Sequence, residues 1–170
     1  MMPRMAMSGG DLFIRITIWV ALIGYLGGAA YAIARGGPRW ERAARAAWTA
    51  GCLLLFVHVG LALQIAHGWS QASVYAETAR QTNEVFGVNW GGGMYINYAL
   101  MLVWLAEVVW WWAAPAVYRR RPRWLVVVWQ GFLLFIVFNA TVVFVAGPLR
   151  WLGLGGCAAL LLLFFRRRRE

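Results

Sequence analysis

The stretch WLVVVWQGFLLFIVFNATVVFVA, residues 124–146, decides the fold class of this 170-residue chain, because it holds no charged side chain. A helix that crosses a bilayer needs roughly 20 mostly apolar residues to traverse a hydrocarbon core about 30 Å thick. Three further stretches meet that length, and a fourth is shorter: 12–34, 46–66, 94–117 and 151–165. We therefore predict an all-α integral membrane helical bundle in a single domain, 1–170, with five transmembrane helices and four as the alternative.

The overall composition agrees with a membrane protein. Hydrophobic residues make up 62% of the chain and charged residues 13%, about half the charged share of an ordinary soluble domain. The mean hydropathy is +0.63. All 16 basic residues are arginine, and the formal net charge is +10. In a soluble chain that charge would suggest nucleic acid. In a chain this apolar it indicates cationic loops that set membrane orientation, and no nucleic acid partner is needed.

The arginines also predict the topology. The loop after the first span and the loop after the third lie on one face, and cationic loops are retained on the cytoplasmic side. These loops carry Arg35, Arg39, Arg42, Arg45, Arg119, Arg120, Arg121 and Arg123. The tail Arg166–Arg169 reaches the same face only if 151–165 also crosses. This favours five spans in a bacterial cytoplasmic membrane, with the N-terminus outside and the C-terminus cytoplasmic.

The first span could be mistaken for a secretory signal peptide. Ala32-Ile33-Ala34 resembles a cleavage site behind an apolar run. Cleavage there would leave the arginines of 35–45 outside, against the charge rule. We therefore expect a retained signal-anchor helix in the reversed orientation.

Small residues in the first span predict a close contact with a second helix. Gly24 and Gly28 are one turn apart, a spacing that lets a second helix approach closely. We expect this contact to be internal, with an oligomer contact as the alternative.

The aromatics favour two interfacial belts over a ligand cage, because Trp and Tyr rings prefer the bilayer surface. The cytoplasmic belt comprises Trp40, Trp48, Trp110–Trp112, Tyr118 and Trp124, and the outer belt Trp69, Trp90, Tyr95 and Trp151.

The longest connection, 68–93, is predicted to carry an outer amphipathic helix between spans two and three. Apolar residues fall near one face of Ser70–Phe86, and Gly87 is a suitable stop. Arg80 has Glu77 and Glu84 at helical spacings, which suits a solvated face. The helix would lie on the outer membrane surface or cap the bundle. The run Gly91-Gly92-Gly93 that follows either forms a turn or lets backbone approach a ligand.

The flanks of this connection supply a candidate outer-face site: His67, Trp69, Asn89, Trp90 and Asn97. The blocks 67–70, 78–82 and 89–98, with 138–144 and 147–151, resemble segments of small, uncharacterised multi-pass bacterial membrane proteins. These blocks make up about a fifth of the chain. The resemblance implies that the outer loop and its flanks form a unit, and it carries no activity across.

A second candidate site lies inside the predicted bilayer region. Polar groups there are costly unless they are partnered, so each is a functional candidate. They are His58, Gln64, Asn97, Glu107, Gln130 and Asn139. A constellation of His58, Glu107 and Asn139 could hold a proton, a cation or the polar head of a quinone. The alternative is that Glu107 is protonated and hydrogen-bonded, stabilising helix contacts.

Cofactor and catalytic signatures are sparse. His58 and His67 are nine residues apart on one helix, which turns them through about 900° to opposite faces, so they cannot ligate one haem together. A single haem with His and Met ligands, or a quinone, remains an alternative. Cys52 and Cys157 lack metal-ligand spacing, and no metal site is predicted. No hydrolase, kinase or zinc-protease signature is present, so no catalytic residue is assigned and a non-enzymatic protein is favoured.

Three functions follow, in order of preference. The first is a structural or accessory subunit that associates with a larger membrane complex or with another copy of itself. The second is a proton or small-solute carrier that uses Glu107 and His58. The third is a redox subunit that binds a quinone or a haem. The first is favoured because few polar residues lie inside the predicted spans and no inverted repeat is visible in the sequence.

Overall fold

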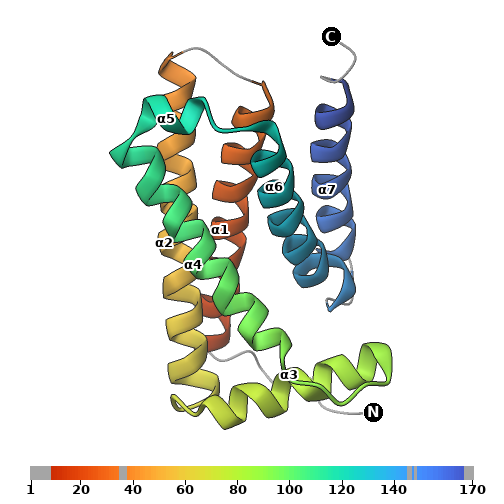
Figure 1. Ribbon diagram of the computed structural model, residues 1–170. Coiled ribbons are helices and arrows are strands. Elements are labelled where there is room, and N and C mark those ends of the chain that lie inside the picture. The colour runs from red at the N-terminus through yellow and green to blue at the C-terminus, as the bar shows by residue number, and fades with distance from the viewer. Residues whose placement is uncertain (1–8, 35–37, 145–146, 148, 167–170) are drawn as a thin grey trace.

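The fold of the chain is all-helical over the residues that the computed structural model describes, 9–34, 38–144, 147 and 149–166 (Figure 1). The elements are α1 (Gly9–Ala34), α2 (Pro38–Ala66), α3 (Gln71–Phe86), α4 (Gly93–Ala113), α5 (Pro115–Arg119), α6 (Arg123–Phe138), the π-helical turn η1 (Asn139–Val143) and α7 (Leu149–Arg166). Four helical stretches are long and apolar enough to cross a membrane: Leu12–Ala30, Arg39–Ala66, Gly93–Ala113 and Arg123–Val143. The chain is thus an all-α protein whose four candidate spans indicate a membrane protein.

Helices α1 and α2 form a tight antiparallel pair because glycines line their contact. A Cβ atom added at Gly24 would lie 2.7 Å from the Ala47 carbonyl oxygen, and one at Gly28 would lie 2.2 Å from the Trp48 ring. Larger residues at either position would push the helices apart. The expected use of these glycines for internal packing is therefore confirmed.

An aromatic cluster fills the core between α1, α2 and α4. The Trp48 ring centroid lies 5.7 Å from that of Tyr25 and 5.1 Å from that of Trp104. Trp48, Trp111 and Tyr118 are all buried. Their assignment to the cytoplasmic belt was therefore wrong, since each lies on the helix face that points into the bundle. Trp40, Trp112 and Trp124 are largely exposed, as a belt requires.

Helix α4 ends earlier than the predicted third span. It stops at Ala113, and Ala114 adopts a non-helical backbone conformation (φ −140°, ψ 64°). Pro115 explains the break, because its ring disfavours a helical conformation in the preceding residue and it has no N–H to donate. The short helix α5 then starts in a new direction at the end of the bundle (Figure 1).

The C-terminal part of the bundle is formed by α6, η1 and α7. Asn139 and Thr141 return side-chain hydrogen bonds to the carbonyls of Phe135 and Val137, both 2.7 Å. Such bonds compete with regular helix geometry and accompany the π-helical turn. Gly153 of α7 packs against this turn, since a Cβ there would lie 2.5 Å from Thr141 Oγ1. Helix α7 runs back beside α6 and α1 (Figure 1).

Helix α3 lies across the end of the bundle where α2 ends and α4 begins (Figure 1). It occupies the segment predicted to be helical. Ser70 caps its N-terminus by accepting a hydrogen bond from the Ser73 N–H. Gly87 ends it in the left-handed region (φ 72°), which glycine adopts without strain, and donates its N–H to the Asn83 carbonyl.

Candidate functional site

The break at Pro115 turns the chain back on itself and brings Tyr118 onto Glu107. The Tyr118 hydroxyl donates a 2.7 Å hydrogen bond to Glu107 Oε1. Its ring stacks on Trp111, with centroids 4.8 Å apart and planes inclined by 14°. Burial, together with the neighbouring Glu107, raises the pKa of the Tyr118 phenol above its ordinary value. The phenol therefore remains a hydrogen-bond donor at neutral pH.

Arg121 completes this cluster from the connection between α5 and α6. Its Nη2 atom lies 3.6 Å from Glu107 Oε1, and its guanidinium carbon lies 3.6 Å from the Tyr118 ring centroid. Only 10% of the Arg121 side chain is exposed. A guanidinium stacks well on an aromatic face, so the ring orients the cation toward the carboxylate.

The second oxygen of Glu107 has no hydrogen-bond partner in the described residues, although Glu107 is only 4% exposed. The indole N–H of Trp129 on α6 approaches the carboxylate without meeting the geometry of a hydrogen bond. A buried acceptor left unpaired is costly. Glu107 thus retains one site at which a proton or a donor group can be accommodated.

From the sequence, Tyr118 was predicted to belong to the cytoplasmic aromatic belt, and Arg121 served only as a signal of topology. A continuous helix would place Tyr118 about 16 Å along the axis from Glu107. Pro115 was the available signal, since it predicts a break between the two residues. The direction of the chain after the break is set by tertiary packing.

The other two members of the predicted intramembrane constellation have different partners. His58 Nδ1 lies 2.9 Å from the Ile14 carbonyl oxygen and 3.5 Å from Thr17 Oγ1, both on α1. Because a carbonyl only accepts, Nδ1 carries the proton in the neutral ring, which leaves Nε2 as the acceptor nitrogen. Asn139 donates to its own helix. Among the described residues, no hydrogen bond or ion pair links His58, Glu107 and Asn139, and their joint site stays a prediction.

At the opposite end of the bundle, His67 and Trp69 form local contacts where α2 turns into α3. His67 Nδ1 lies 3.0 Å from Ser73 Oγ. The Trp69 indole donates to Gln64 Oε1, and the Trp69 N–H donates to the Leu63 carbonyl. These two bonds hold Trp69 at φ 61°, a conformation that a bulky residue seldom adopts.

The remaining candidates of this outer-face set, Asn89, Trp90 and Asn97, are exposed. The glycines between them serve packing: a Cβ at Gly91 would lie 2.3 Å from the Tyr75 carbonyl oxygen. The Gly91-Gly92-Gly93 run therefore lets the start of α4 approach the α3 backbone. No hydrogen bond in the described part of the chain joins Asn89, Trp90 or Asn97 to His67.

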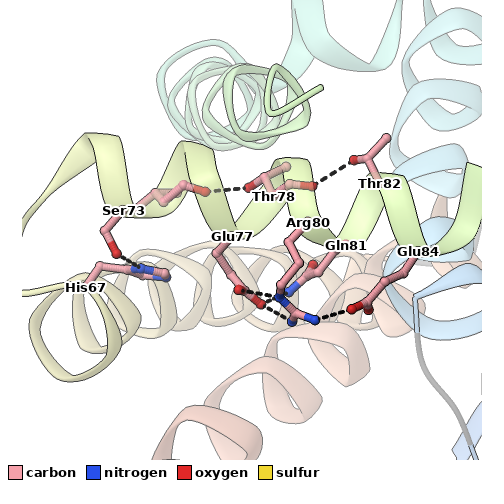
Figure 2. Close-up of polar contacts among 9 residues, drawn as sticks. His67, Ser73, Glu77, Thr78, Arg80, Gln81, Thr82 and Glu84 are labelled. Carbon is pink, nitrogen blue, oxygen red and sulfur yellow. Dashed lines mark hydrogen bonds and ion pairs between the residues drawn. The ribbon is translucent and has the colours of Figure 1, made fainter. Parts of the chain in front are cut away.

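Polar side chains of α3 divide between two sides of the helix (Figure 2). Thr78 and Thr82 point to one side and donate to carbonyls one turn earlier. On the other side, Arg80 pairs with Glu77 at 2.6 Å and with Glu84, as the spacing predicted. The hydrogen bond from Arg80 lowers the pKa of Glu77 to about 2. A shallow open groove on this side is lined by Ala66, His67, Ser73, Ala76, Glu77, Arg80 and Gln81.

Metal-binding and redox groups are few in the part of the chain that the structure describes. It contains no cluster of three or more His, Cys, Asp or Glu residues. Cys52 and Cys157 are both buried and free. No protein-family model, curated protein or solved structure matches this chain.

Proposed function

We propose that this chain is a structural or accessory subunit of a membrane assembly, with α3 and its flanking turns as the contact surface. The observation that carries the proposal is the way α3 is fixed to the bundle along its length. Tyr98 of α4 donates a 2.7 Å hydrogen bond to Gln71 near its start. Ala79 is buried in its middle. Phe86 at its end contacts Phe144 edge-on, with ring centroids 6.1 Å apart.

A surface that is held in one geometry before binding loses less entropy when a partner docks. The side of α3 with Glu77, Arg80 and Gln81 faces away from these attachments to α4 and is the side with the groove. Its alternating charges suit a polar partner surface. We take that partner to be another subunit of a membrane complex or a second copy of this chain.

The proposal includes a topology. Five spans, with α3 as an amphipathic helix outside a bacterial cytoplasmic membrane, would place the N-terminus outside and the C-terminus in the cytoplasm. Its support is the arrangement of α7, which runs antiparallel to α6 and ends at the same end of the bundle as α5 (Figure 1). Helix α7 is short for a span, but flanking arginines can extend to the headgroups and the bilayer can thin locally.

Purification in mild detergent with quantitative mass spectrometry tests the proposed surface. A Gln81→Trp substitution would block the groove, whereas Asn83→Trp places the same bulk about 200° around the helix. We expect a stoichiometric partner, or a second copy, to be lost from Gln81→Trp and kept by Asn83→Trp. A wild-type chain that purifies alone as a monomer would contradict the accessory function, as would equal binding by both variants.

Proton carriage is a second candidate function, and the unpartnered Glu107 Oε2 favours it. Buried carboxylates in membrane spans often serve as proton sites. Proteoliposomes that contain a pH-sensitive dye would report the flux. If protons pass through Glu107, the Glu107→Gln variant should show no proton flux. Adding Gln130→Glu to that variant, which places a carboxylate on α6 instead, should not restore the flux. An unchanged flux in Glu107→Gln would remove this candidate.

A further inference from the structure

The arginines at the α5 end of the bundle fall into two groups with different surroundings. Three of them are engaged within the protein. Arg119 pairs with Glu41 at 2.9 Å, Arg121 lies against Glu107, and the Arg45 guanidinium lies 4.2 Å from the Trp112 ring centroid. These contacts join the start of α2 to the end of α4 and to α5. They hold that end of the bundle together.

The second group is free of such contacts. Arg39, Arg42, Arg120 and Arg123 are exposed, and none of their guanidinium groups has a hydrogen bond or an ion pair with another described residue. Glu41, the nearby acid on α2, is already paired with Arg119. The four guanidinium groups therefore form a cationic surface that no ion pair within the described residues neutralises.

Exposed tryptophans accompany this surface. Trp40 is 71% exposed, Trp112 is 53% exposed and Trp124 is 66% exposed. Such rings prefer the headgroup level of a bilayer. They therefore place the four free arginines at the depth of the lipid phosphates. Cationic side chains at that depth attract anionic lipids by about 1 kcal/mol each.

We propose that Arg39, Arg42, Arg120 and Arg123 form a binding surface for the phosphate headgroups of anionic phospholipids. A guanidinium presents paired N–H donors to phosphate oxygens, so the recognition combines charge with hydrogen bonding. Binding at this end is independent of the proposed partner surface on α3, which lies at the other end of the bundle (Figure 1).

Native mass spectrometry of the full chain in detergent micelles tests the surface with dioleoyl phosphatidylglycerol and dioleoyl phosphatidylcholine. The double variant Arg42→Gln, Arg120→Gln removes two free arginines from this end. The matched control is Arg15→Gln, Arg150→Gln, which removes two exposed arginines elsewhere. We expect the first variant to bind phosphatidylglycerol about 25-fold more weakly, and the control to bind it as the wild type does.

Two further measurements separate charge from structure and lipid from free anion. Arg42→Lys, Arg120→Lys keeps the charge and should restore most of the binding. Inorganic phosphate at the same concentration should not displace the lipid. Equal weakening in the two double variants, equal binding of both lipids, or displacement by inorganic phosphate would each overturn the proposal.

Discussion

The Tyr118 hydroxyl donates a hydrogen bond to Glu107 across the break that Pro115 makes between α4 and α5. The bond links the C-terminal half of α4 to α5, which runs in a different direction. Arg121 approaches the same carboxylate oxygen from the far side of the turn. The turn is therefore fixed by a buried carboxylate that the helix before it supplies.

A Tyr118→Phe substitution should destabilise this turn. It removes the donor to Glu107 but keeps the ring that stacks on Trp111. A buried acceptor that loses its donor costs about 1–3 kcal/mol. We expect the free energy of unfolding in mixed detergent micelles to fall by that amount.

A double-mutant cycle with Glu107→Gln separates the hydrogen bond from other effects of the two substitutions. Residues in direct contact give coupling energies of about 0.5–3 kcal/mol. Additive effects of Tyr118→Phe and Glu107→Gln would show that the bond contributes nothing to stability.

Gly24→Ala should weaken the pairing of α1 with α2. The new Cβ would lie 2.7 Å from the Ala47 carbonyl oxygen and 2.8 Å from the Gly51 Cα, both backbone atoms. The helices would have to separate, at an overpacking cost of about 1–3 kcal/mol.

The neighbouring Gly27→Ala is the matched control for that substitution. Its Cβ would lie 3.8 Å from the Ala47 side chain, which is ordinary contact. Alanine favours the helix over glycine by about 1 kcal/mol. The same unfolding measurement should show this variant as stable as the wild type or more so. A loss of stability equal to that of Gly24→Ala would contradict the packing argument.

The helices themselves were predictable because their signals are local. Apolar length predicted the four candidate spans, and the spacing of Arg80 between Glu77 and Glu84 predicted both ion pairs of α3. Glycines one turn apart predicted an internal helix contact, although not that Trp48 would fill the space over Gly28. Periodicity and length need no knowledge of the partner element.

The partners of Glu107 were not predictable from the same signals. Tyr118 reaches Glu107 because of a change of direction after Pro115, and the direction depends on how α5 packs on Trp111. Trp111 and Trp112 are adjacent in sequence, yet one is buried and the other exposed. A residue count along the predicted third span places both tryptophans at nearly the same depth in the bilayer. Only the packed structure shows which face of α4 points inward.

Acidification should loosen α3 through Glu77. The hydrogen bond from Arg80 lowers the pKa of this carboxyl from 4.5 to about 2. A pKa that is lower in the folded state gives a contribution to stability that is present above 4.5 and is lost as the pH falls toward 2. Hydrogen exchange of the α3 amides, corrected for its intrinsic pH dependence, should show protection falling in that window. Arg80→Gln should remove this pH dependence, and an unchanged profile in the variant would contradict the assignment.

The proposed five-span topology predicts that the two ends of α7 lie on opposite sides of the membrane. Helix α7 begins at Leu149 and runs back beside α6. A reporter fused after Gly147 should be found outside the cytoplasm, and a reporter fused after Glu170 should be found inside it. The first fusion is the internal control, because it lies outside in both the four-span and the five-span arrangement. A C-terminal reporter on the outer side would leave α7 lying along the bundle without crossing. In that case Arg166–Arg169 would lie outside the cytoplasm, contrary to the charge rule from which the fifth span was predicted.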